Sequence, residues 1–219
     1  IAALDWLAVA RSWTRVQYLT KPGAMLALLL WMWTAGRAAP GGAAPGAWGW
    51  FLAAVAASLA GDVFLMLPRE QFIPGLVSFL LAHLAYVVGL NQSPPPFNLV
   101  ALVLVFAVGM AAGRIYLLIK AGLAASGRMR LHLPVLLYST VISLMLISAL
   151  FTLVRPEWPA FAALLVSAGA FLFFLSDTLL AWNRFVAPLA NARLKVRIPY
   201  HLGQIALVVG AGLYLFVGA

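Results

Sequence analysis

Residues 158–182 read WPAFAALLVSAGAFLFFLSDTLLAW, and this stretch decides the class of fold. It is long and apolar, and Asp177 is its single ionisable side chain. A helix that crosses a bilayer needs about 20 mostly apolar residues. The stretch is therefore predicted to be a transmembrane helix, and the rest of the chain repeats the same pattern.

Seven stretches meet this requirement in all. They cover residues 19–36, 47–68, 72–90, 97–119, 132–154, 158–182 and 198–218. Residues 1–10 are apolar but too short to span, so we interpret them as the end of a truncated first helix, which would make eight spans. No intervening segment is long enough to form an extramembrane domain. The sequence thus predicts an all-α, polytopic transmembrane bundle that is a single domain over residues 1–219.

The composition of the 219 residues supports this class, because 65% are hydrophobic and only 9% are charged. A soluble domain is about 45–50% apolar and about 25% charged. A soluble globular protein and a disordered chain are both excluded. The chain has no cysteine, which excludes disulfides, thiolate catalysis and iron–sulfur clusters.

The basic residues predict the orientation of the chain in the membrane. Twelve of the 14 lysines and arginines fall in or beside alternate loops, and the other loops hold only Arg37 and Arg155. Loops rich in lysine and arginine face the cytoplasm. The net charge of +9 is explained in this way, so we predict no nucleic-acid partner. We expect a multi-pass protein of a bacterial inner (plasma) membrane, with its C-terminus facing outward.

Two of the five carboxyl groups lie inside predicted spans. Asp5 belongs to the short first segment, and Glu70 and Glu157 lie in turns beside arginines, which leaves Asp62 and Asp177. An ionisable side chain at the centre of a spanning helix costs at least about 2.5–3.5 kcal/mol, so such residues are candidates for function. Both lie about 8–9 Å from the cytoplasmic end of spans that run in the same direction. We therefore predict that the two carboxyl groups share one layer of the membrane, could face each other and are candidates for function.

The surroundings of the two aspartates are alike, which suggests a parallel internal repeat. Each is followed by an arginine seven residues later and by a histidine on the next span. The matching pairs are Arg69 with Arg184 and His83 with His201. The alternative reading is that each aspartate only bonds a serine or tyrosine and fixes helix packing.

Further polar side chains lie at the level of the aspartates or, in the case of His83 and the nearby Tyr86, closer to the bilayer middle, and they are predicted to contact substrate. They are Lys21, His83, Tyr86, Asn183, Arg184, Tyr200, His201 and Gln204. A snorkelling lysine at position 21 and purely structural histidines at positions 83 and 201 are the alternatives. Nucleophile-elbow, zinc-protease and phosphate-loop motifs are absent from the sequence, and the histidine and aspartate spacing matches no zinc motif. We predict neither a cofactor nor a metal.

Five short stretches are similar to a known family. They are KPGAM at 21–25, GDVFLM at 61–66, FLLAHLAY at 79–86, GAFLFFLSD at 169–177 and YHLGQ at 200–204. In these stretches the chain resembles the YhhN family of membrane proteins, the lysoplasmalogenases. The resemblance implies eight spans and hydrolysis of the vinyl ether bond of a lysoplasmalogen. The implied products are a fatty aldehyde and glycerophosphoethanolamine or glycerophosphocholine, with Asp62 and Asp177 as the catalytic pair.

The residue types fit this chemistry. A vinyl ether is cleaved after protonation of its β-carbon, which requires a carboxylic acid and a second carboxylate to orient water, and two nearby aspartates tend to share one proton. The predicted partners are a lysophospholipid and membrane lipids, with Lys21 and Arg184 at the phosphate and access from the inner leaflet. A hydrolase of another lysolipid linkage, a proton-coupled transporter and a non-enzymatic lipid-binding protein are the rival predictions. The sequence does not define an oligomeric state.

Overall fold

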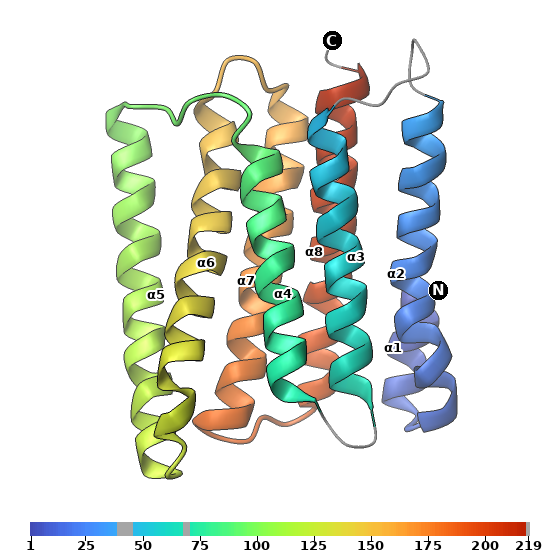
Figure 1. The fold of residues 1–219 in the computed structure, drawn as a ribbon, viewed down its shortest axis with the longest axis vertical. Helices are drawn as coiled ribbons and strands as arrows, with labels where there is room; N and C mark the ends of the chain where they lie inside the picture. Colours follow the sequence, from blue (N-terminus) through green and yellow to red (C-terminus); the bar gives the residue numbers. More distant parts are fainter. Residues whose placement is uncertain (39–45, 68–70, 218–219) are drawn as a thin grey trace.

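The computed structural model describes residues 1–38, 46–67 and 71–217, and these ranges form eight α-helices and no strand (Figure 1). The helices are α1 (Ala2–Ala10), α2 (Thr14–Arg37), α3 (Gly46–Met66), α4 (Phe72–Leu90), α5 (Leu99–Ala125), α6 (His132–Phe151), α7 (Ala160–Phe185) and α8 (Ala192–Gly212). Short 3₁₀ turns at Met129–Leu131 and Thr152–Val154 flank α6, and a π-helical turn, Leu213–Val217, extends α8. The predicted all-α helical bundle is confirmed.

Six helices of the described ranges, α3 to α8, are long and apolar enough to cross a membrane. Helix α2 has 24 residues and is long enough, but its first half carries Arg15, Gln17 and Lys21 and is less apolar. The predicted span at residues 19–36 therefore forms a helix, but this helix is not among those apolar enough to be counted as membrane-spanning. Helix α1 has only nine residues and is too short to span, as expected for residues 1–10.

The last helix differs from the prediction because it begins at Ala192 and not near residue 198. Asn191 takes a left-handed backbone conformation, with φ of 54°, and this residue starts the helix directly after a short turn. Arg193 and Arg197 consequently belong to the first two turns of α8, where the sequence had suggested a loop. Arg114 and Lys120 lie likewise within α5, which continues to Ala125.

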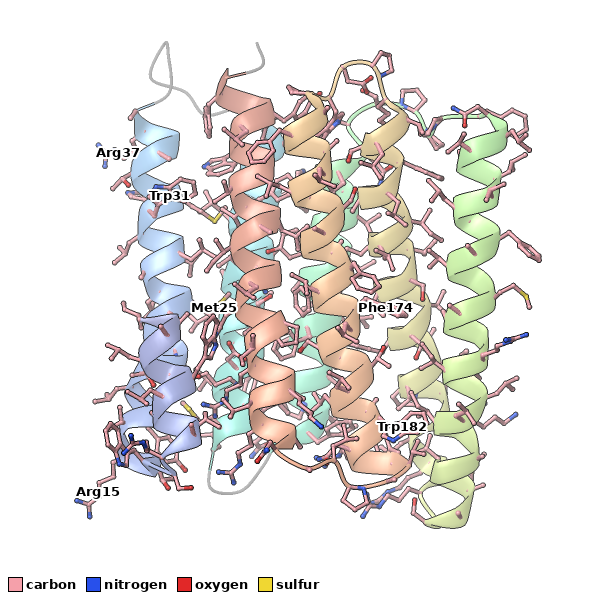
Figure 2. The ribbon with its side chains drawn as sticks, turned by 180° about the vertical axis from the view of Figure 1, so that it is seen from behind. Arg15, Met25, Trp31, Arg37, Phe174 and Trp182 are labelled. Carbon is pink, nitrogen blue, oxygen red and sulfur yellow. The ribbon has the colours of Figure 1, made fainter. Side chains whose placement is uncertain are left out.

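The basic loops lie together at one end of the bundle. The connections between α1 and α2, α5 and α6, and α7 and α8 reach the lower end in Figure 1, and the C-terminus lies at the upper end. Figure 2 shows Arg15 and Trp182 at the first end and Arg37 at the other. We call the first end the basic end. Residues 39–45 and 68–70 lie outside the described residues, and they include Arg69 and Glu70 of a predicted turn.

The two helices that carry the end of the chain pack closely. A Cβ atom at Gly169 of α7 would lie 2.6 Å from the backbone nitrogen of Leu207 and 2.8 Å from the carbonyl oxygen of Gly203 on α8. Only glycine permits this approach, which is typical of small residues at helix contacts in membranes. The close α7–α8 contact brings Tyr200 of α8 beside Phe173 of α7, with ring centroids 5.3 Å apart.

Arg155 closes the end opposite to the basic end. Its Nη1 donates to the carbonyl oxygen of Leu90 at 2.6 Å, and its Nη2 donates to Oδ1 of Asn91 at 3.0 Å and to the carbonyl oxygen of Ser93 at 3.2 Å. Burial lowers the pKa of the Arg155 guanidinium, and the nearby Glu157 carboxylate opposes this change. The side chain ties the α6–α7 turn to the end of α4.

Candidate functional site

Asp62 lies near the end of α3 and is 2% exposed. Its Oδ1 lies 2.8 Å from Nζ of Lys21 on α2, and its Oδ2 accepts a hydrogen bond of 2.7 Å from the hydroxyl of Tyr200 on α8. A buried charge is tolerated when it is paired and hydrogen-bonded. Both oxygens of Asp62 have such a partner, and the carboxyl group is held between three helices.

Asp177 lies on α7 and has different partners. The hydroxyl of Tyr138 on α6 donates to its Oδ2, and Nε2 of His83 on α4 lies 3.3 Å from the same oxygen. Nε2 of His83 also lies 2.9 Å from the Tyr138 hydroxyl oxygen. The tyrosine gives its one proton to the carboxyl group, so its oxygen can accept from the imidazole. Among the described hydrogen bonds none engages Oδ1 of Asp177, which leaves that oxygen for chemistry.

Each aspartate is thus contacted from the other half of the chain. Tyr200 on α8 reaches Asp62, and His83 on α4 reaches Asp177. The two halves that the sequence suggested as a repeat are interlocked at this level. Among the described contacts none joins the two carboxyl groups directly. Both of them instead line the space that lies between them.

That space is a polar cavity with about 840 Å³ of empty volume. Its walls come from α2, α3, α4, α7 and α8, and both aspartates line it. Three basic side chains, Lys21, Arg193 and Arg197, line it as well. A cavity with three cations and two carboxyl groups at the basic end of the bundle is suited to an anionic group.

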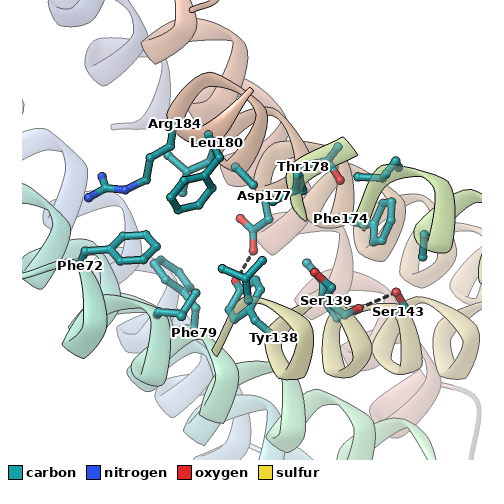
Figure 3. A pocket seen from close by; sticks show the side chains of 18 of the residues that line it. Phe72, Phe79, Tyr138, Ser139, Ser143, Phe174, Asp177, Thr178, Leu180 and Arg184 are labelled. Atoms are coloured by element: carbon teal, nitrogen blue, oxygen red, sulfur yellow. Dashed lines mark hydrogen bonds between the residues drawn. The ribbon is translucent and has the colours of Figure 1, made fainter. Parts of the chain in front are cut away.

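A second cavity adjoins the first and is apolar. It has about 740 Å³ of empty volume and lies between α4, α5, α6 and α7. Its charged side chains, among the residues that line it, are Asp177 and Arg184. Figure 3 shows the Asp177 carboxyl group directed at Tyr138, and the guanidinium of Arg184 lies 4.0 Å from the ring centroid of Phe72. The rest of the wall suits a hydrocarbon chain.

Asp177 is the carboxyl group at which the two cavities meet. Four residues line both cavities: Leu65, Phe79, Asp177 and Leu180. Asp62 lines the polar cavity alone. An amphiphile with its chain in the apolar cavity and its head in the polar one would therefore place the bond between chain and head beside Asp177.

Several residues predicted to contact substrate lie behind the cavity walls. The Tyr86 hydroxyl donates to Oε1 of Gln204, and Nε2 of Gln204 donates to Oγ of Ser58 at 2.8 Å. All three are completely buried, and none of them lines either cavity. They form a satisfied polar network that packs α3, α4 and α8 together.

His201 and Asn183 have partners in other parts of the bundle. Nδ1 of His201 accepts a hydrogen bond of 3.1 Å from Nε1 of Trp6 on α1, and this histidine lines neither cavity. Asn183 lines the polar cavity, but its Oδ1 accepts from the backbone nitrogen of Leu189 at 2.8 Å. The asparagine therefore fixes the turn that leads into α8.

Sequence reasoning missed Tyr138, Arg193 and Arg197 as members of the site. The run Tyr138-Ser139-Thr140 interrupts an otherwise apolar span, which is a signal that could have drawn attention to the tyrosine. The two arginines were interpreted as loop charges, since the start of α8 at Ala192 depends on the backbone of Asn191. Among the described residues no three His, Asp or Glu side chains are grouped closely enough to hold a metal ion.

The fold and the two cavities together define a multi-helix membrane protein with one polar and one apolar cavity that share the carboxyl group of Asp177. The model of the YhhN family matches residues 16–211, and the chain belongs to this family.

The chain is similar to three relatives whose names state an activity. It is 34% identical to lysoplasmalogenase TMEM86B of Sus scrofa over 160 residues, which cover 70% of this chain and 59% of that protein. It is 31% identical to lysoplasmalogenase TMEM86B of Mus musculus over 216 residues, which cover 95% and 80%. It is 29% identical to lysoplasmalogenase of Mycobacterium tuberculosis over 171 residues, which cover 75% and 60%. No solved structure matches the chain at a significant level.

Proposed function

We propose that the chain is an intramembrane hydrolase that cleaves the vinyl ether bond of a lysoplasmalogen. The products are a fatty aldehyde and a glycerophospho head group such as glycerophosphoethanolamine or glycerophosphocholine. The names of the relatives support the substrate class. The observation that carries the proposal is the position of Asp177, which lines both the apolar and the polar cavity.

The two cavities give the substrate a defined direction. The alkenyl chain lies in the apolar cavity, where most of the wall is hydrocarbon, and the glycerophosphate lies in the polar cavity. We assign the phosphate to Arg193 and Arg197, because Lys21 is engaged by Asp62 and Arg184 lies over Phe72 in the apolar cavity. Arg197 is bonded to Asp5 through Nη1, which leaves its other N–H groups for the phosphate. Arginine suits this task because its planar fork of donors matches phosphate oxygens.

Asp177 is the acid in this scheme. Its Oδ1 delivers a proton to the β-carbon of the vinyl ether, and an oxocarbenium ion forms at the carbon bonded to oxygen. Its Oδ2 meanwhile accepts from Tyr138 and faces His83. These donors stabilise the carboxylate that remains after the proton has left, as preorganised hydrogen bonds do wherever charge develops in a reaction.

Asp62 is the base. Its carboxylate, paired with Lys21, orients a water molecule and takes a proton from it as the oxygen adds to the oxocarbenium carbon. The hemiacetal then collapses: its hydroxyl proton passes to the Asp177 carboxylate, its bond to the glycerol oxygen breaks, and the leaving oxygen takes the proton that Asp62 had gained from water, so both carboxyl groups return to their starting states. One water is consumed, and the fatty aldehyde and the glycerophospho product are released.

The packing above the cavities favours a hydrolase over a proton-coupled transporter. Trp48, Phe51, Tyr86 and Phe173 are almost completely buried in the core, and none of them lines either of the two cavities described for residues 1–38, 46–67 and 71–217. A transporter needs access from both sides of a central site, commonly through broken helices. Because both cavities lie toward the basic end, we propose a site near the cytoplasmic face of the plasma membrane, reached from the inner leaflet.

Aldehyde release from defined lipids tests this function. The purified protein in detergent is given a 1-alkenyl lysophospholipid, the saturated 1-alkyl analogue and a 1-acyl lysophospholipid in parallel. We expect aldehyde from the alkenyl lipid and no cleavage of the other two. Cleavage of the acyl lipid alone would assign the site to a different linkage, and no cleavage by folded protein would contradict a hydrolase.

A further inference from the structure

Asp5 is a buried carboxyl group that the proposed reaction does not use. It lies on α1 and has no exposed surface. Nη1 of Arg197 on α8 donates to its Oδ1 at 2.9 Å and to its Oδ2 at 3.0 Å, and the hydroxyl of Thr20 on α2 donates to Oδ1 at 2.8 Å. The carboxylate of Asp5 on α1 is therefore bonded to α8 through Arg197 and to α2 through Thr20.

The same arginine lines the polar cavity beside Lys21 and Arg193. In the described hydrogen bonds Asp5 engages only its Nη1, so the remaining N–H groups of the guanidinium can serve a ligand. An arginine near the end of a membrane helix otherwise extends its charged group toward water. The pairing with Asp5 keeps Arg197, whose side chain is only 14% exposed, at the cavity wall.

We propose that Asp5 is a positioning residue that holds Arg197 in the polar cavity to bind the phosphate of a single-chain lipid. The inference rests on the proposed function for the identity of the lipid. It adds to that function a role for α1, which carries no residue that lines either cavity. Asp5 acts through Arg197 and does not touch the lipid.

The contact between α1 and the rest of the bundle offers a matched control. Nε1 of Trp6 donates to Nδ1 of His201, and Nε2 of Gln17 donates to the carbonyl oxygen of Ala8 at 3.1 Å. Both bonds hold α1 in place without involving Arg197. Trp6→Phe therefore weakens the docking of α1 and leaves the Asp5–Arg197 pair intact, whereas Asp5→Asn removes the charge of the pair and leaves the contacts of α1 through Trp6 and Ala8.

Equilibrium binding of lipids that the enzyme does not cleave tests the proposal without turnover. A 1-alkyl lysophospholipid and a 1-alkylglycerol of the same chain length differ in the phosphate head. We expect Asp5→Asn and Arg197→Gln each to weaken binding of the phospholipid about tenfold, as is usual when a hydrogen bond to a charged group is lost. Binding of the alkylglycerol is expected to stay within a factor of two of the native value. Trp6→Phe is expected to bind both lipids as the native protein does.

Two further arms complete the test. The double variant Asp5→Asn/Arg197→Gln is expected to bind the phospholipid no more weakly than Arg197→Gln alone, because the two residues act in series. Glycerol 3-phosphate, titrated alone, is expected to bind at least a hundredfold more weakly than the phospholipid, since it lacks the chain.

Three results would overturn the proposal: equal losses for both lipids, native binding by Asp5→Asn, or tight binding of glycerol 3-phosphate. If Asp5→Asn fails to fold, Arg197→Gln provides the test. Native binding of the phospholipid by Arg197→Gln would show that Arg197 does not contact the phosphate. A failure here leaves aldehyde release by the native protein unaffected. An absence of aldehyde release, conversely, leaves the binding comparison valid.

Discussion

Nζ of Lys21 lies 2.8 Å from Oδ1 of Asp62, so a cation on α2 is paired with a carboxylate on α3 inside the bundle. The pair stands at the wall of the polar cavity, and Tyr200 completes it from α8. In the reaction that we propose, this pair belongs to the base, Asp62, and Asp177 with its different partners is the acid, so the two roles are assigned by the surroundings of the carboxyl groups.

Lys21→Gln removes the cation from Asp62. We expect kcat to fall about a hundredfold, because a carboxyl group that has lost its cationic partner in a dry site takes up a proton and no longer accepts one from water. General base catalysis typically contributes at least that factor. Lys195→Gln is the control, since Lys195 is exposed on α8 and does not line the cavity. Steady-state aldehyde release measures both variants, and equal activities would refute the role of the pair.

Tyr138→Phe removes the hydrogen bond to Oδ2 of Asp177 and preserves the ring. We expect kcat to decrease about a hundredfold with little change in KM, since the donor stabilises the carboxylate only after proton transfer. Tyr116→Phe is the matched control, because Tyr116 contacts His132 and lines neither cavity. A rise in KM with unchanged kcat for Tyr138→Phe would instead indicate a role in substrate binding.

Ala112→Leu reduces the volume of the apolar cavity, which Ala112 lines from α5. We expect kcat/KM for the longest alkenyl chains to fall about tenfold and that for short chains to persist, as is typical when a pocket loses room for a methylene group. Ala111→Leu, on the exposed side of the same turn, is the control. The measurement is kcat/KM for a series of lysolipids of increasing alkenyl chain length. An unchanged dependence on chain length would show that the alkenyl chain does not bind in this cavity.

Gly169→Ala tests the close contact of α7 with α8. The new Cβ would lie 2.6 Å from the backbone nitrogen of Leu207, so the helices must separate, and we expect a loss of about 1–3 kcal/mol in the free energy of unfolding. Gly109→Ala has open space around its Cβ position and is expected to be at least as stable as the native chain. Thermal unfolding in one detergent compares them, and equal midpoints would show that the contact is looser than described.

The helices were largely predictable from the sequence, because every helix that spans the hydrocarbon of a bilayer needs about 20 mostly apolar residues. The prediction for 72–90 agrees with α4 at both ends, and that for 47–68 agrees with α3 to within two residues. The start of α8 was not predictable, since it depends on the left-handed backbone of Asn191. A polar first turn has no hydropathy signal, and Arg193 and Arg197 were therefore placed in a loop.

The sequence predicted the site residues whose types are rare in membrane spans, but not those whose types are common there. Asp62 and Asp177 are visible because carboxyl groups are costly in a membrane, and both line the polar cavity. Tyr138 and Ser58 are residue types that occur in any span, so only the packing of α6 and α3 identifies their partners. Asp5 lies 192 positions from Arg197, and no local pattern joins them.

Aldehyde release by Asp177→Asn and Asp62→Asn tests the central claim most directly. Both variants are compared with native protein on a 1-alkenyl lysophospholipid, after thermal unfolding has shown that they are folded. We expect each variant to lose at least a hundredfold in kcat, because the first lacks the acid and the second lacks the base. Retention of native activity by folded Asp177→Asn would contradict the account, since proton delivery at the junction of the two cavities would then come from another group.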